Sequence, residues 1–277
     1  MSFDQYFGHS GVLVNRSGPT GEDAGDSAQM TGLYRFGRYM KLRGNKDALI
    51  KEQAKFAQEL DILTYTEGTG NIDMTGVKHE QVSYPGIYIR SPKPCYPPWA
   101  ANPHCFSRDQ QRSLVFAMGA LKQKKKLLQI FWQHVKRIGW YQNDQEVDGT
   151  SLPLYRRDIA PPDVLGEYVR AGYMAGFIFL GILWPLLIAS DLFSLVGLLI
   201  NLAKWKHNPA DVDDDNQILA ILQAKVALPT PISWLTRKLY KWFRPGGAVN
   251  AMATKHRAET GSPPFIELYK NILNKEL

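Results

Sequence analysis

An almost uncharged segment, residues 171–203, constrains the fold of this chain more than any other feature. Asp191 is its only charged residue. A stretch of this length satisfies the length rule for a membrane-spanning helix. Ser190 and Asp191 divide the run, however, as an N-cap would if one buried helix ended after Pro185 and another began at Leu192. We therefore expect buried helices of a soluble core, and a membrane-associated hairpin over 171–203 is the alternative.

The remaining apolar residues recur mostly at helical spacing, which predicts a mainly α fold. Capping residues, prolines and periodicity place seven further helices: from 26 or 27, over 45–65, from 107, over 124–141, from 161, over 213–226 and over 231–243, and a last one begins at 263. Such a succession indicates antiparallel helical hairpins, with a toroid-like (α/α) array as one arrangement, in a single domain over 1–277.

Two segments interrupt the helical pattern. Residues 1–24 read as irregular because glycines punctuate them, and residues 67–107 form a long loop rich in proline and tyrosine with a hairpin expected at 81–90. Loops of this length in a compact domain are often functional. The tyrosines favour an ordered loop.

Charge and cysteine content limit the partners and the compartment. The net charge of +7 and the pI near 9.2 permit acidic partners such as polyanionic glycans or anionic lipid. Cys95 and Cys105 are the only cysteines, so we expect free thiols in a reducing compartment. The first residues lack the basic and apolar regions of a secretory signal, which predicts a cytoplasmic protein or a virion component.

Two expected helix starts carry polar clusters, Gly25-Asp26-Ser27-Ala28-Gln29 and Ser107-Arg108-Asp109-Gln110. Free N–H groups at helix starts favour anions and substrate oxygens. If both starts face one cleft, Asp26 and Asp109 form an acid/base pair, and Gln29, Arg108 and Gln110 orient the substrate. The alternative is that these residues are ordinary helix caps.

Aromatic and basic side chains near these clusters suit a sugar-binding cleft, in which rings stack on sugars and arginine binds hydroxyls and acids. The candidates are Arg35, Arg38, Tyr84, Tyr88, Arg90, Trp99 and His104. The equally weighted alternative is that the loop aromatics fill a satellite core.

The general layout of helical hairpins, helix-start clusters and a long loop resembles the (α/α)-toroid carbohydrate-active proteins, which include lyases and glycosidases. The resemblance implies binding or cleavage of a polyanionic or neutral polysaccharide. A non-enzymatic structural or interaction protein that binds other subunits, such as a virion component, is the second hypothesis, and a membrane-associated protein is the third.

A basic stretch at 122–126 contains four lysines and leads into an amphipathic segment with Phe131 and Trp132. It predicts contact with anionic lipid or nucleic acid, or else a solvated turn. Nucleotide-phosphate loops, paired C-x-x-C motifs and G-x-S-x-G are all absent, so we expect no cofactor and no metal. Nucleic acid is not the expected partner.

Overall fold

The chain is mainly α-helical in a computed structural model that describes residues 27–67, 74–76, 78, 80–89, 108–133, 161–177, 183–207 and 215–243. The described helices are α1 (Ser27–Leu42), α2 (Lys46–Ile62), α3 (Arg108–Ala120), α4 (Lys124–Gln133), α5 (Pro161–Ala175), α6 (Trp184–His207), α7 (Asp215–Val226) and α8 (Pro231–Phe243). The mainly α prediction is confirmed, and α8 has the predicted bounds. The described helices show no toroid.

Helices α1 and α2 form the first antiparallel hairpin. Ala28, Leu33, Phe36 and Met40 recur at helical spacing and are all buried. The Asn45 side chain accepts a hydrogen bond from the Ala48 backbone N–H at 3.1 Å and so caps the start of α2. Ile50 of α2 lies on the solvent side, since its side chain is 61% exposed.

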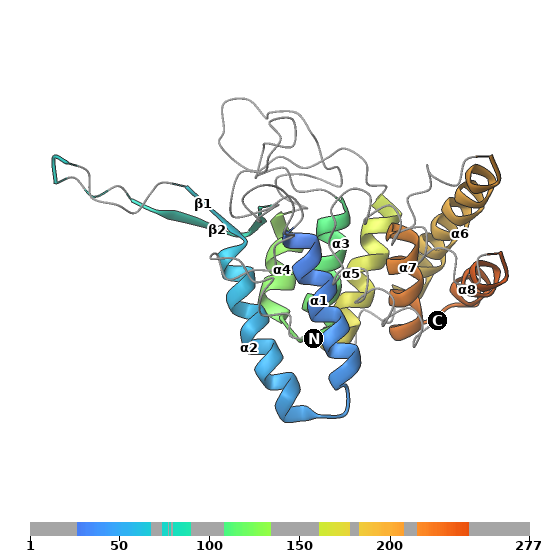
Figure 1. Cartoon of the computed structure of the whole chain (residues 1–277), viewed down its shortest axis with the longest axis horizontal. Coiled ribbons are helices and arrows are strands. Elements are labelled where there is room, and N and C mark those ends of the chain that lie inside the picture. Colours follow the sequence, from blue (N-terminus) through green and yellow to red (C-terminus); the bar gives the residue numbers. More distant parts are fainter. Residues whose placement is uncertain are drawn as a thin grey trace, which may run out of the picture.

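The expected helix over 45–65 ends early because a strand follows it. Strand β1 (Thr64–Glu67) pairs antiparallel with β2 (Val82–Tyr88), and a bulge separates the pairs Thr64–Tyr88 and Thr66–Ser83. The strand expected within 81–90 is present, but it pairs with β1, which follows α2, and does not form a hairpin within 81–90. The two strands extend from the helical body as an arm (Figure 1).

Helix α3 lies at the centre of the fold and packs against α1 on one side and α5 on the other. Glycines make these close approaches possible. A Cβ at Gly32 would overlap the backbone of Ser113, and a Cβ at Gly119 would overlap the backbone of Ala171. The helix axes can approach closely because these residues have no side chain.

The weakly charged segment does not divide where the sequence suggested. Helix α6 runs without interruption through Ser190 and Asp191, so the predicted helix start at Leu192 is wrong. Asp191 is instead buried inside the protein, where Arg170 and Thr230 bind its carboxylate. None of the described helices is long and apolar enough to cross a membrane.

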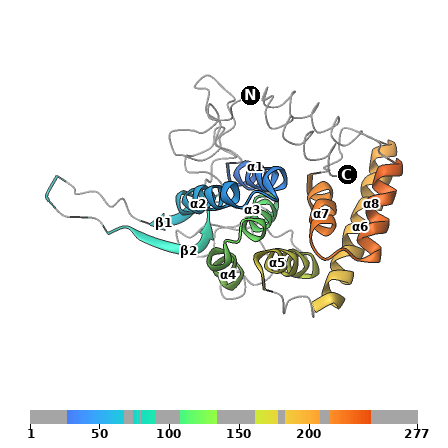
Figure 2. The same ribbon diagram turned by 90° about the horizontal axis from the view of Figure 1, so that it is seen from below.

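The C-terminal helices form an outer layer. Helix α6 packs against α5 and α8, and α7 contacts α3, α5, α6 and α8. Figure 2 shows α6 and α8 side by side at the end of the molecule opposite the β arm. The α4 helix, which packs against β2, lies nearer the arm (Figure 2).

Candidate functional site

The predicted acid/base pair falls largely outside the described residues. Asp26, Arg90, Trp99 and His104 are not among them. Arg108 and Asp109 lie in the first turn of α3, but the structure describes only their backbone. The proposal that Asp26 and Asp109 act together therefore stays a prediction.

The predicted binding residues that are described lie mostly inside the protein. Gln29 in α1 and Gln110 in α3 are buried. Tyr88 is fully buried in the core next to the β arm, and the half-buried Tyr84 ring packs against the Tyr65 ring at a centroid distance of 5.5 Å. Both tyrosines therefore pack with the hydrophobic core of the described structure, and their role in binding stays a prediction.

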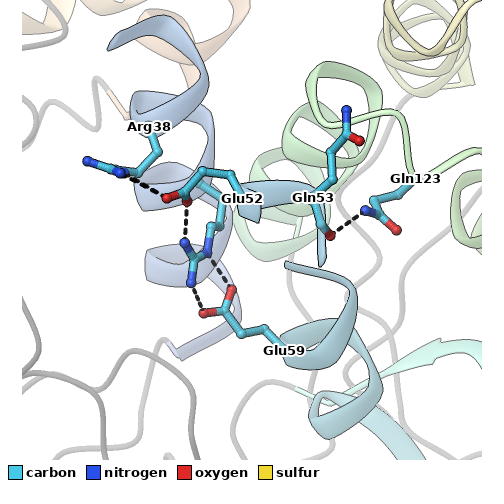
Figure 3. A network of polar contacts seen from close by, with 6 residues as sticks. Arg38, Glu52, Gln53, Glu59 and Gln123 are labelled. Carbon is cyan, nitrogen blue, oxygen red and sulfur yellow. Dashed lines mark hydrogen bonds and ion pairs between the residues drawn. The ribbon is translucent and has the colours of Figure 1, made fainter. Parts of the chain in front are cut away.

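Arg35 and Arg38 belong to a network that joins α1 to α2. The buried Arg35 guanidinium donates to the carboxylates of both Glu52 and Glu59, and its Nε–Glu59 Oε2 distance is 2.7 Å. Arg38 adds a second cation on Glu52, with its Nη2 2.9 Å from Oε1. Figure 3 shows that Glu52 contacts Arg38 on one side and is connected to Glu59 on the other through the dashed contacts.

The two glutamates have opposite pKa shifts. Burial raises the pKa of the Glu59 carboxyl, and the single guanidinium of Arg35 only partly offsets that effect. Burial would also raise the pKa of Glu52, but the Arg38 hydrogen bond and the charges of Arg35 and Arg38 lower it below the ordinary value. Glu52 is therefore the more strongly stabilised anion.

Equivalent buried ion pairs join later helices. Arg112 of α3 pairs with Glu167 of α5, and Arg170 of α5 pairs with Asp191 of α6 at 2.7 Å. These pairs link α3 to α5 and α5 to α6. Their position between helices gives them a structural function, since removal of one partner would leave a buried charge uncompensated.

A different group of side chains lines a cavity of the described structure that has a volume of about 500 Å³. We call it the lysine pocket, because Lys122, Lys124, Lys125 and Lys126 line it together with a single acidic residue, Asp61. The other lining residues are Thr64, Ser83, Pro85, Tyr88, Gln123 and Gln129. The pocket thus lies between the end of α2, the β arm and the turn from α3 to α4.

The backbone of the α3–α4 turn brings the lysines together. The Gln123 N–H donates to the Met118 carbonyl at 2.8 Å, and Lys122 has a φ of 57°. This is a Schellman motif, in which glycine is the usual residue at the left-handed position. Gly176 occupies the equivalent position after α5, with a φ of 96° and a 2.8 Å bond from the Phe177 N–H to the Gly172 carbonyl.

Three of these lysines contact other residues, two of them outside the lining of the pocket. The Lys122 ammonium donates to the Met174 carbonyl, the Lys124 Nζ lies 5.6 Å from the centre of the Phe177 ring, and Lys126 pairs with the exposed Asp61. Partial burial is the main cause that lowers the pKa of Lys122, and the positive charge of Lys124 lowers it further. No ion-pair partner of Lys125 is present among the described residues.

No known protein family, curated protein or solved structure matches this chain. Its site must therefore be interpreted from its own geometry. Within the described ranges, no group of three His, Cys, Asp or Glu side chains is placed to hold a metal ion.

The walls of the lysine pocket depend on one close backbone approach. Gly86 of β2 has a φ of 87°, and a Cβ there would overlap the backbone of Gln129 in α4. The Gln133 side chain donates to the Pro85 carbonyl at 3.1 Å and fixes the same strand against α4. Gln123 holds the turn to α2 through a 2.8 Å bond to the Gln53 carbonyl (Figure 3).

The sequence signal for this pocket was the lysine run itself, which predicted contact with acidic partners. The sequence did not show that β2 and the end of α2 would form the other walls. That assembly depends on contacts between segments far apart in the chain.

Proposed function

We propose that the protein binds acidic polysaccharides and that the lysine pocket holds the anionic groups. The observation that carries the proposal is the charge of the lining, which contains four lysines and one aspartate. Such a group of like charges raises the local concentration of an anionic ligand.

The helix that follows the turn adds to the same field. Lys124, Lys125 and Lys126 form the first turn of α4, and that turn has no acidic residue. The N-terminus of a helix carries a partial positive charge, so acidic side chains normally stabilise it and lysines do not. A bound sulfate or carboxylate would remove this repulsion.

The pocket also has features that suit a sugar. Its volume of about 500 Å³ lies in the usual range for small-ligand sites. Ser83 and Gln129 contribute a hydroxyl and an amide to the lining, which can bind sugar hydroxyls. This proposal keeps the polysaccharide ligand of the sequence hypothesis, and places it at the lysines rather than at the two helix starts.

The test measures binding of a sulfated glycan, a uronate polymer and a neutral glucan to the wild-type protein and to Lys124→Ala/Lys125→Ala. We expect the acidic polymers to bind and the double variant to lose about tenfold or more in affinity, because hydrogen bonds to charged groups contribute roughly 1.5–3 kcal/mol each. Lys46→Ala/Lys51→Ala is the matched control, since both lysines are exposed on α2.

Equal losses in the two double variants would refute the pocket, because net charge alone would then explain binding. Equal affinity for the neutral glucan would refute the anionic specificity. Tighter binding of single-stranded DNA than of any glycan would assign the pocket to a different class of polymer.

A further inference from the structure

The outer surface of the α6/α8 layer is apolar. Its exposed residues from α6 include Leu192, Phe193, Val196, Leu199 and Ile200, and those from α8 include Trp234, Leu235 and Trp242. Trp242 is 74% exposed and Trp234 is 54% exposed. We call this set the α6/α8 face. A contiguous apolar surface of this kind marks an interaction site rather than ordinary surface composition.

The face is spatially continuous because its two helices are neighbours. Helix α8 packs on α6, and the two lie side by side in Figure 2. The opposite side of α8 faces the protein, where Ser233, Thr236 and Tyr240 are buried. The tryptophans therefore point away from the body of the protein. Their spacing along the sequence alone would also suit a helix buried in the core.

The charges on this surface have one sign. Every charged residue of α8 is basic, namely Arg237, Lys238 and Lys241. The single acid of α6, Asp191, is buried and bound to Arg170. The Lys238 Nζ lies 5.4 Å from the centre of the Trp234 ring, so cations and tryptophans are interspersed on α8.

Tryptophan, leucine and phenylalanine combined with lysine and arginine are typical of helices that lie in the interface of a bilayer. Lysine stems extend along apolar surface and place the ammonium among anionic headgroups. We propose that the α6/α8 face docks on the surface of an anionic lipid bilayer.

The core holds these helices in a surface-bound position. Arg170 of α5 anchors α6 through Asp191, and Thr230, which precedes α8, donates to the same carboxylate at 2.6 Å. Insertion of α6 into the bilayer would break this buried ion pair, which is costly. No described helix is long and apolar enough to span a bilayer. The α6/α8 face therefore lies on the lipid while the core stays intact.

A second copy of the chain is a poorer occupant than lipid. A pairing of two α6/α8 faces would bury the basic residues of α8 against a surface whose described side chains offer no acid to pair with them. Like charges without partners oppose such an interface.

The experiment is sedimentation of the full chain with phosphatidylcholine vesicles that contain either no anionic lipid or one quarter phosphatidylglycerol. We expect binding to the anionic vesicles. Trp234→Ala/Trp242→Ala should weaken it at least tenfold, and Lys238→Glu/Lys241→Glu should weaken it at low salt. Ile50→Ala and Lys46→Glu/Lys51→Glu are matched controls, because these residues are exposed on α2.

Three results would overturn the inference. The first is unchanged binding in both α8 variants, and the second is binding that is lost only in Lys124→Ala/Lys125→Ala, which would assign the lipid contact to the lysine pocket. The third is absence of vesicle binding together with a concentration-dependent dimer that Trp234→Ala/Trp242→Ala abolishes, because a second copy would then occupy the face.

Discussion

Lys122 occupies a backbone position where glycine is normally preferred. Its φ of 57° costs roughly 1–2 kcal/mol for a residue with a side chain. The chain uses Gly176 at the equivalent point after α5, so the motif itself does not require lysine. Backbone strain that persists in this way is often found at functional sites.

We therefore predict opposite effects of Lys122→Gly on stability and on binding. Lys122→Gly should be about 1 kcal/mol more stable than Lys122→Ala, because only alanine retains the strained backbone. Both variants should bind acidic polysaccharide more weakly than the wild type, since both lack the ammonium group. Urea unfolding and affinity measurements on the two variants check this prediction. Equal stabilities of the two variants would contradict the strain argument.

At the residue level the sequence did not reveal the partners of the polar side chains. Arg35 and Arg38 were assigned to a substrate, but Glu52 and Glu59 bind them. The sequence could not show this because the partners lie a helix away, and their meeting depends on how α1 packs on α2. The grouping of the lysines of 122–126 was visible in the sequence, because a local turn brings them together.

The stability of the interface between α1 and α2 depends on the ionisation of Glu52 and Glu59. Because the Glu52 pKa is lowered in the folded protein, its contribution to stability is present above the ordinary carboxyl pKa and is lost as the pH falls through the lowered value. The Glu59 pKa is raised, so ionisation of Glu59 opposes folding as the pH rises through the ordinary value toward the raised value.

We predict that Glu52→Gln lowers the free energy of unfolding by about 3 kcal/mol or more at pH 7, because Arg35 and Arg38 both lose an anionic partner. Glu59→Gln should cost less, since the amide resembles the protonated carboxyl that burial favours. The cost of Glu52→Gln should shrink as the pH falls through the pKa of Glu52. Denaturant unfolding between pH 3 and pH 7 tests both statements.

Glu80→Gln is the control for this series, because Glu80 is exposed. Its effect should stay within about 0.5 kcal/mol. Equal costs of Glu52→Gln and Glu59→Gln at pH 7 would contradict the proposed division of the network.

At the element level the sequence predicted the helix starts at Pro161 and Pro231 correctly and the start after Asp191 wrongly. Pro161 and Pro231 correctly marked the starts of α5 and α8, because proline suits the first helical turn. Asp191 was taken for a helix start, since an isolated acid after serine is typical of a cap. Its true role depends on Arg170 and Thr230, which approach it only in the folded protein.

At the scale of the whole molecule, the described helices form a core around α3 and an outer layer that includes α6 and α8 (Figure 1). The Asp191 carboxylate joins them, since it accepts hydrogen bonds from Arg170 at 2.7 Å and from Thr230 at 2.6 Å. Gly166 allows this junction, because a Cβ there would overlap the Ser190 side chain. The position of the α6/α8 face thus depends on one buried acid.

We predict that Asp191→Asn loosens the outer layer more than the core. The substitution leaves the Arg170 charge buried without an anionic partner, and such a loss costs about 3–5 kcal/mol. Amide hydrogen exchange should accelerate in α6 and α8, whereas α1 and α3 should change little, because their contacts do not involve Asp191. Thr230→Val removes the donor to Asp191 and the acceptor for the Ser233 N–H at the start of α8, but it keeps the ion pair, so it should show the same pattern at smaller amplitude. A uniform acceleration over all helices would instead indicate that the core and the outer layer unfold as one cooperative unit.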